Sequence, residues 1–255
     1  MKCLLAIAGS DSCAGAGIQA DIKTAYKLNY HAVTVISALT AQNSVDVLDI
    51  MAVPQDFIYK QLKAILDDIV PDATKIGMLF SSEAIEIVSE VLLKNRLPCI
   101  VLDPLVRSST GKMLLDENGI CKLKKRLFPV VDLITPNVYE AEILTETKIK
   151  NLKDMEKASI ILYEAGAKNV IITGYHKRGK IIDMVFDGRD FFYIKDTLLP
   201  SQHNHGSGCV YSSSIAIYMS QGHPLKKAAT FAHDFTKEAI MHGYPMGKGS
   251  GSVFP

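Results

Sequence analysis

The 255-residue chain is predicted to fold as an α/β protein with a mostly parallel sheet. Short apolar runs alternate with amphipathic segments from one end of the chain to the other, which is the pattern of βαβ units. Most of these runs are apolar at nearly every position, as in strands that helices cover on both faces. No linker-like stretch divides the chain, so we expect residues 1–255 to form a single domain.

Six apolar runs are the predicted buried strands of this sheet. They are Cys3–Ala8, Ala32–Ala38, Ala73–Gly77, Cys99–Leu102, Val131–Thr135 and Val170–Thr173. The segments between them have helical periodicity. In Gln55–Asp68, for example, apolar side chains recur every three or four residues, and lysine and aspartate fill most other positions.

Two segments depart from the βαβ rhythm. Val45–Val53 alternates apolar and polar residues, which predicts a half-exposed strand. Ile181–Phe186 and Phe191–Ile194 flank Asp187-Gly188 and predict a small antiparallel hairpin. We expect both segments at sheet edges or over a pocket.

Composition and charge exclude several classes of protein. The chain is 48% hydrophobic, contains no Trp, and has no apolar run near the length that spans a bilayer. Its 28 basic and 27 acidic residues give a net charge of +1, so no overall field attracts nucleic acid or an anionic membrane. We therefore expect neither as a partner.

The cysteines indicate a reducing compartment. Five cysteines form an odd set without CxxC spacing, which fits free thiols better than a disulfide framework. The opening Met1–Ala8 has too short an apolar run for a signal peptide and is interpreted as the first strand. The sequence thus predicts a cytoplasmic protein.

The most informative stretch is Asn204-His205-Gly206-Ser207-Gly208-Cys209, which leads into a long apolar helix reaching about Gln221. Glycines let the backbone approach a ligand, and free N–H groups with the helix dipole favour an anion. The same field would stabilise a Cys209 thiolate. An ordinary loop with a packed cysteine remains an equal alternative. A last helix is predicted from Pro224 to about His242.

A second glycine-rich stretch, residues 9–17, follows the first strand. Gly15-Ala16-Gly17-Ile18-Gln19-Ala20 matches the loose dinucleotide fingerprint G-x-G-x-x-G/A. Six residues separate Ala8 from Gly15, however, and no carboxylate ends the second strand. These departures argue against a nicotinamide or flavin site.

Asn137-x-x-Glu140 places an amide and a carboxylate at one helix start. The pair can hold hydrated magnesium beside phosphates, or it can be an N-cap with an acidic first turn. Asp103 ends the fourth predicted strand, where open α/β sheets place ligand groups. His203-x-His205 is interpreted as loop polarity, because no histidine has metal-ligand spacing.

Seven ordered motifs carry a family resemblance. They are Ala8-Gly9-Ser10-Asp11-Ser12, the run from Gly15 to Thr24, Ala38-Leu39-Thr40-Ala41-Gln42-Asn43, Lys75-Ile76-Gly77-Met78-Leu79, Val101-Leu102-Asp103-Pro104, Ile134-Thr135-Pro136-Asn137 and His205-Gly206-Ser207-Gly208-Cys209. In these motifs the chain resembles the ThiD-like hydroxymethylpyrimidine/phosphomethylpyrimidine kinases of thiamine biosynthesis, which are ribokinase-like. The resemblance implies a three-layer α/β/α sandwich and ATP-dependent phosphorylation of the pyrimidine alcohol and then of its monophosphate.

The resemblance also assigns substrate residues. It implies that the pyrimidine lies against Gly9, Asp21, Gln42 and Met78. A carboxylate and a carboxamide can address the exocyclic amine and ring nitrogens of an aminopyrimidine, while a methionine can cover the ring face.

For phosphoryl transfer, the resemblance implies an anion hole at Gly206, Ser207 and Gly208, with Cys209 nearest the substrate hydroxymethyl group. A thiol whose pKa is lowered by the helix terminus can serve, because positioning dominates this chemistry. The residues implied for ATP and its phosphates are Asp103, Asn137, Glu140 and Thr173, of which Asp103 and Glu140 are also implied for Mg²⁺.

The chain departs from the family at two positions that often carry a positive charge. Ser109 and Thr173 stand where family members often carry lysine near the ATP phosphates, so transfer should be substantially slower unless Arg107, Lys112, Lys177 or a second metal ion compensates. Two alternatives therefore stay open. One is a pyridoxal or pyridoxine kinase, since pyridoxal kinases of the same branch resemble the chain around Thr173. The other is a pyrimidine-binding protein with impaired catalysis.

The resemblance further suggests a homodimer. The predicted edge strand Val45–Val53 is one candidate interface, and an ordinary solvent-exposed edge is the equal alternative.

Overall fold

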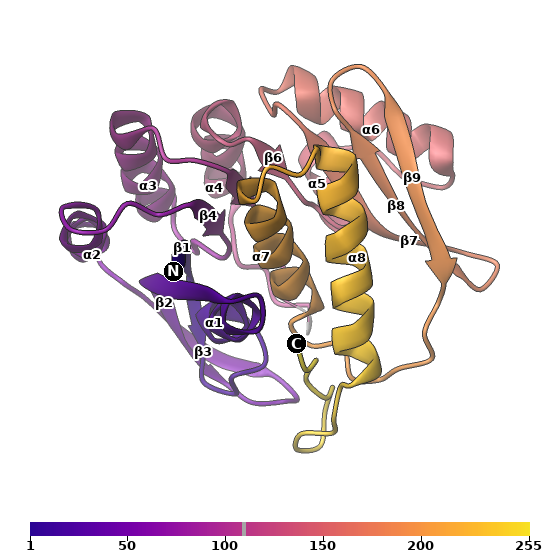
Figure 1. The fold of residues 1–255 in the computed structure, drawn as a ribbon, viewed down its shortest axis with the longest axis horizontal. Helices are drawn as coiled ribbons and strands as arrows, with labels where there is room; N and C mark the ends of the chain where they lie inside the picture. Colours follow the sequence, from indigo (N-terminus) through magenta and orange to yellow (C-terminus); the bar gives the residue numbers. More distant parts are fainter. Residues whose placement is uncertain (109–110) are drawn as a thin grey trace.

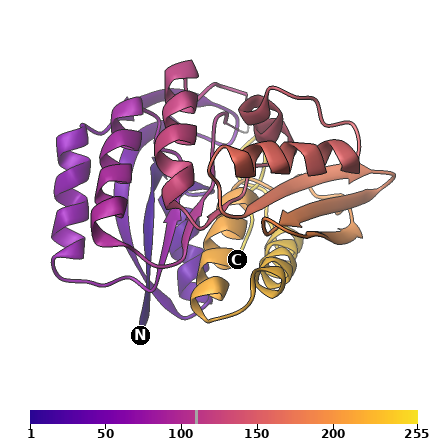
Figure 2. The ribbon, with the colours of Figure 1, turned by 90° about the horizontal axis from the view of Figure 1, so that it is seen from above.

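A nine-stranded sheet between two layers of helices forms the framework of the protein (Figures 1 and 2). The computed structural model describes residues 1–108 and 111–255. The strand order is β3-β2-β1-β4-β5-β6-β7-β8-β9. The predicted three-layer α/β/α architecture is confirmed.

The six central strands are parallel. They are β1 (Lys2–Asp11), β2 (Tyr30–Gln42), β4 (Ala73–Ile76), β5 (Ile100–Leu102), β6 (Leu133–Ile134) and β7 (Val170–Lys177). Each corresponds to one predicted apolar run. Their side chains feed two buried cores, one on each face of the sheet.

The two segments that depart from the βαβ rhythm lie at opposite edges of the sheet, as predicted. β3 (Val47–Ala52) pairs antiparallel with β2. β8 (Lys180–Phe186) and β9 (Phe191–Thr197) form the predicted hairpin and extend the sheet beyond β7. Each edge strand is therefore antiparallel to its neighbour.

Helices cover both faces of the sheet. One layer contains α2 (Gln55–Leu66), α3 (Ser82–Asn95), α4 (Glu117–Lys122), α5 (Val138–Thr145) and α6 (Leu152–Glu164), with two short helical turns over Leu123–Leu127 and Phe128–Val130. The other contains α1 (Gly17–Lys27), α7 (Ser207–Ser220) and α8 (Leu225–Met241). Among these described helices, none is long and apolar enough to cross a bilayer.

The main difference from the predicted boundaries concerns β1 and β2, which run past Ala8 and Ala38. The polar residues there remain paired between the two strands, with Ser10 opposite Leu39 and Asp11 opposite Thr40. Hydrophobicity cannot reveal such an extension, because backbone hydrogen bonds rather than apolar burial hold it. The extension carries Asp11 and Gln42 to the rim of the sheet.

Candidate active site

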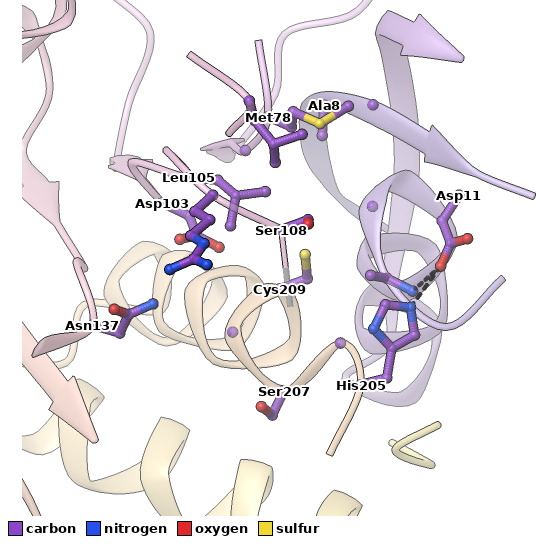
Figure 3. Close-up of a pocket in the computed structure, with 18 of the residues that line it drawn as sticks. Ala8, Asp11, Met78, Asp103, Leu105, Ser108, Asn137, His205, Ser207 and Cys209 are labelled. Carbon is purple, nitrogen blue, oxygen red and sulfur yellow. Dashed lines mark hydrogen bonds and ion pairs between the residues drawn. The ribbon is translucent and has the colours of Figure 1, made fainter. Parts of the chain in front are cut away.

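A cavity of about 620 Å³ opens at the carboxyl ends of the parallel strands, beside the N-terminus of α7. This is where open α/β sheets place ligands. Most of the site residues predicted from the sequence line it: Gly9, Gln42, Met78, Asp103, Asn137, Glu140, Thr173, Gly206, Ser207, Gly208 and Cys209. In Figure 3, Cys209 lies between two groups of side chains. Asp103 and Asn137 are on one side, and Asp11 and His205 are on the other.

Gly9 and Met78 form one wall through a close approach. A Cβ atom built on Gly9 would lie 2.3 Å from the Cε atom of Met78, so a larger residue would displace the methionine. Met78 is buried and belongs to a small cluster with Ala38 and Leu114. Glycine at position 9 therefore leaves room for a flat apolar surface that can cover a ring.

The structure places Asp21 differently from the sequence prediction. Asp21 does not line the cavity but lies fully buried, with both carboxylate oxygens within 2.8–3.0 Å of the Lys75 Nζ atom. Ser213 on α7 donates a further hydrogen bond to it, at 2.7 Å. Its carboxylate is thus not exposed to the cavity and instead holds Lys75 and α7 in place.

Lys75 is a functional candidate that the sequence reasoning missed. It is a lysine within an apolar strand, and a buried charge requires a partner, so its position alone was a signal. Burial lowers the pKa of Lys75, but Asp21 and, more weakly, Cys209 and Asp103 raise it above the ordinary value. The ammonium group is therefore a permanent positive charge beneath the cavity.

The first turn of α7 has the geometry of an anion site. Gly206 has φ of +90°, and a Cβ there would lie 1.9 Å from the carbonyl oxygen of Gly15, so only glycine fits. The Ser207 amide donates to Asn204, at 3.1 Å. Among the described residues, no group accepts a hydrogen bond from the amides of Gly208 and Cys209. Those two amides and the helix dipole favour an anion.

The predicted lowering of the Cys209 pKa is wrong for the free protein. Burial raises the pKa of this thiol to about 12; Lys75 opposes the rise, and Asp21 and Asp103 add to it. Desolvation thus outweighs both the nearby ammonium group and the position at a helix terminus. Cys209 is a neutral thiol at pH 7.

Asp103, Asn137 and Glu140 form the opposite side of the cavity. Asn137 caps α5 by accepting from the Glu140 amide, and Glu140 accepts in return from the Asn137 amide, both at 2.9 Å. The N-cap interpretation is thus correct, and both Asn137 and Glu140 also line the cavity. The second carboxylate oxygen of Glu140, Oε1, is buried and has no hydrogen-bond partner within the described part of the chain.

The two carboxylates influence each other. Burial, opposed by Lys75, raises the pKa of Asp103 to about 6. Burial and the neighbouring Asp103 raise the pKa of Glu140 well above its ordinary value. Among the described residues, no group of three or more histidines, cysteines or carboxylates surrounds a metal position. Two carboxylates alone match the way proteins hold Mg²⁺ together with substrate phosphates.

Arg107 brings a positive charge to the cavity wall near Asn137 and Tyr139. It lines the cavity, its guanidinium lies 5.0 Å from the centre of the Tyr139 ring, and it donates to the Gly111 carbonyl. Of the other compensating cations proposed, Lys112 and Lys177 are exposed and do not line the cavity. Thr173 does line it, whereas Ser109 lies outside the described residues.

The interpretation of His205 as loop polarity is wrong. Its ring lines the cavity and contacts both Asp11, at 2.9 Å, and Gln42, at 3.3 Å. Neither periodicity nor spacing signals such a contact, because the three residues are far apart in the sequence. The structure alone brings them together.

Comparisons with known proteins converge on one family. A family model described as phosphomethylpyrimidine kinase matches residues 11–254. The hydroxymethylpyrimidine/phosphomethylpyrimidine kinase of Aquifex aeolicus is 42% identical over 246 residues, which are 96% of each protein. The thiamine biosynthesis bifunctional protein ThiED of Geobacter sulfurreducens is 41% identical over 98% of this chain, and this chain spans about half of its length (51%).

A solved structure extends the comparison to vitamin B6. The pyridoxal kinase from Staphylococcus aureus in complex with AMP-PCP and pyridoxal superposes with a TM-score of 0.91 and is 33% identical. The superposition covers 99% of this chain and 93% of that chain.

Proposed function

The chain belongs to the phosphomethylpyrimidine kinase family and is an ATP-dependent kinase of thiamine biosynthesis, and from that premise we propose its substrate and mechanism. The substrate is 4-amino-5-hydroxymethyl-2-methylpyrimidine, which receives one phosphoryl group at its hydroxymethyl oxygen and a second on the resulting monophosphate. One observation supports this most: Gln42 and Met78 line the same cavity as the first turn of α7 and Cys209.

The pyrimidine occupies the part of the cavity beside Gly9, Gln42 and Met78. The methionine covers the ring face, and the Gln42 carboxamide addresses the polar edge of the ring. Asp21 holds this pocket indirectly, through Lys75 and Ser213. The hydroxymethyl group then points toward Cys209.

The first turn of α7 stabilises the transferring phosphoryl group. The amides of Gly208 and Cys209 donate hydrogen bonds to its equatorial oxygens and so stabilise the negative charge that develops there. Because the transition state is loose, the substrate hydroxyl keeps its proton until late in the transfer, when the proton passes to an oxygen of the transferred phosphoryl group and ADP leaves. A neutral Cys209 thiol can orient the hydroxyl group. Lys75 contributes a fixed positive charge below this point.

Asp103 and Glu140 fit a magnesium ion. Both carboxylates are buried, Asp103 raises the proton affinity of Glu140, and Glu140 Oε1 has no hydrogen-bond partner among the described residues. When bound, the ion neutralises phosphate oxygens of ATP. Asn137 and Thr173 border the same space, and Arg107 supplies the side-chain cation that Thr173 cannot.

The experiment is phosphorylation by the purified protein, followed by phosphorus NMR. With ATP, magnesium and the pyrimidine, we expect the monophosphate and then the diphosphate. Cys209→Ala should lower kcat at least about tenfold, whereas Cys121→Ala should not change it, because Cys121 is exposed and lies outside the cavity. Absence of any phosphorylated pyrimidine contradicts the proposal, and so does equal activity of both variants.

Pyridoxal or pyridoxine is the second candidate substrate, favoured by the likeness to the Staphylococcus aureus pyridoxal kinase. The carboxamide of Gln42 favours the pyrimidine, whose edge carries more nitrogen atoms that it can address. Binding of the pyrimidine without turnover would instead indicate an impaired catalyst.

We also propose that the kinase is a cytoplasmic homodimer. All five cysteines are free thiols, which suits a reducing compartment. β3 is an edge strand whose Leu48 and Met51 are more than 60% exposed, so two copies can pair there. Light scattering should give twice the chain mass for the wild type and the single mass for Leu48→Lys/Met51→Lys. A monomeric wild type contradicts this proposal.

A further inference from the structure

Three cavity-wall residues are connected in series by short contacts. Gln42 ends β2, Asp11 ends β1, and His205 precedes α7. The His205 Nε2 atom lies 2.9 Å from Asp11 Oδ2 and 3.3 Å from the side-chain nitrogen of Gln42 (Figure 3). His205 and Asp11 are 10% and 4% exposed, so water competes little for these bonds.

The Asp11 carboxylate accepts from every partner around it. The backbone amides of Cys13, Gly15 and Ala16 donate to it, at 2.8, 3.1 and 2.9 Å. Burial opposes ionisation, but the hydrogen bonds from His205 and from these amides lower the pKa of Asp11 below its ordinary value. An ionised carboxylate has no proton to donate. His205 therefore carries a proton on Nε2, and this N–H group donates a hydrogen bond to Asp11.

This proton fixes the orientation of the Gln42 carboxamide. A protonated Nε2 atom of His205 has no lone pair in the ring plane, so a second N–H group pointing at it would be repelled. A 180° rotation of the carboxamide, which exchanges two atoms of nearly equal size, brings its oxygen to His205 instead. The amino group of Gln42 is then directed away from His205.

We propose that His205, held by Asp11, orients Gln42 so that its amino group faces the cavity as a hydrogen-bond donor and selects a ring nitrogen of the substrate. His205 is a positioning residue for substrate choice, and this inference rests on the proposed pyrimidine kinase function. An aromatic ring with C–H at the same place offers no acceptor and leaves the donor unpaired.

The test compares side chains that keep or lose the Nε2–H donor. His205→Leu removes it, whereas His205→Gln places an N–H group at nearly the same distance from the backbone. We expect KM for the pyrimidine to rise about tenfold in His205→Leu, with little change in kcat or in KM for ATP, and to stay within about twofold of wild type in His205→Gln. His176→Leu is the matched control, because His176 is exposed and outside the cavity.

A second pair of measurements tests the orientation of Gln42 directly. Gln42→Glu keeps the shape but cannot donate, so calorimetric titration should show pyrimidine binding weakened about tenfold or more. A pyridine analogue with C–H in place of the ring nitrogen should bind wild type and Gln42→Glu alike.

Each other outcome overturns the proposal. Equal effects of His205→Leu and His205→Gln, a loss confined to kcat, or full binding by Gln42→Glu would each contradict an oriented donor. If the wild type neither binds nor phosphorylates the pyrimidine, the proposed function fails and the inference fails with it. If the wild type does both and the variants match it, only the inference fails.

Discussion

At the scale of single residues, two charged side chains that do not line the cavity hold its wall in place. Lys75 and Asp21 form a fully buried ion pair beneath it, and Ser213 on α7 completes the pair. Such pairs stabilise a fold little, but they are costly to break, because the remaining charge stays buried without a partner. The pair therefore acts as a constraint on where β4, α1 and α7 meet.

This constraint gives a stability prediction. Lys75→Met should lower the free energy of unfolding by about 3–5 kcal/mol, and Lys75→Met/Asp21→Leu should recover most of the loss. Lys60→Met removes an exposed pair with Asp56 and should change stability by less than about 1 kcal/mol. Denaturant titrations measure all three. A loss below about 1 kcal/mol in Lys75→Met would contradict a buried ionised pair.

Asp103 gives a prediction for pH. Its pKa of about 6 means that it is protonated below that value, and a protonated carboxyl group holds magnesium poorly. The kcat/KM for ATP should therefore fall as the pH drops through about 6. The measurement requires a constant concentration of the magnesium–ATP complex. A profile that is flat from about pH 5 to 8 would exclude Asp103 from the metal site.

Residue patterns predicted many of the residues that line the site, but they did not predict which side chains contact one another. The glycines before α7, Asp103 and the pair Asn137 and Glu140 all line the cavity, because strand ends and helix starts leave local signals. The ion pair of Lys75 and the hydrogen bonds of His205 join segments far apart in the chain. Chemical pairing between distant residues has no periodicity, so only the folded structure reveals it.

At the scale of elements, the alternation of apolar runs predicts the strands and helices, but it does not predict the residues at which they end. β1 and β2 continue past their apolar cores because backbone pairing persists through polar residues such as Ser10 and Thr40. β6 is shorter than Val131–Thr135, because only Leu133 and Ile134 pair with β5 and only Ile134 pairs with β7. Hydrophobicity marks the buried centre of a strand, whereas hydrogen bonds set its ends.

The start of α7 gives the prediction at this scale. Gly206→Ala and Gly222→Ala place a side chain at similar positive φ angles, at the two ends of one helix. Both substitutions introduce about 1–2 kcal/mol of conformational strain. Only Gly206→Ala also collides with the Gly15 carbonyl, whereas Gly222 has open space around its Cβ position.

The collision should displace the anion site and lower kcat by about 100-fold or more, with Gly222→Ala retaining wild-type kcat. Steady-state kinetics with thermal melting separate the two effects. Equal kcat in both variants would show that the backbone of Gly206 is not needed for transfer.

At the scale of the whole molecule, one continuous sheet joins the first strand to the last hairpin. We propose that residues 1–255 are a single cooperative domain, because helices α7 and α8, late in the chain, pack with early strands in one core. Calorimetry should show one unfolding transition with equal calorimetric and van't Hoff enthalpies. Two resolved transitions would indicate separate domains.

The same architecture explains why substrate choice is the open point among these kinases. The fold, the anion site and the paired carboxylates suit phosphoryl transfer to many alcohols, whereas the wall formed by Gly9, Gln42 and Met78 is the part of the cavity that we propose contacts the ring. The most direct test is therefore kcat/KM for the hydroxymethylpyrimidine against that for pyridoxal, measured with saturating ATP and magnesium. We expect a value at least about tenfold higher for the pyrimidine. An equal or higher value for pyridoxal would contradict this expectation.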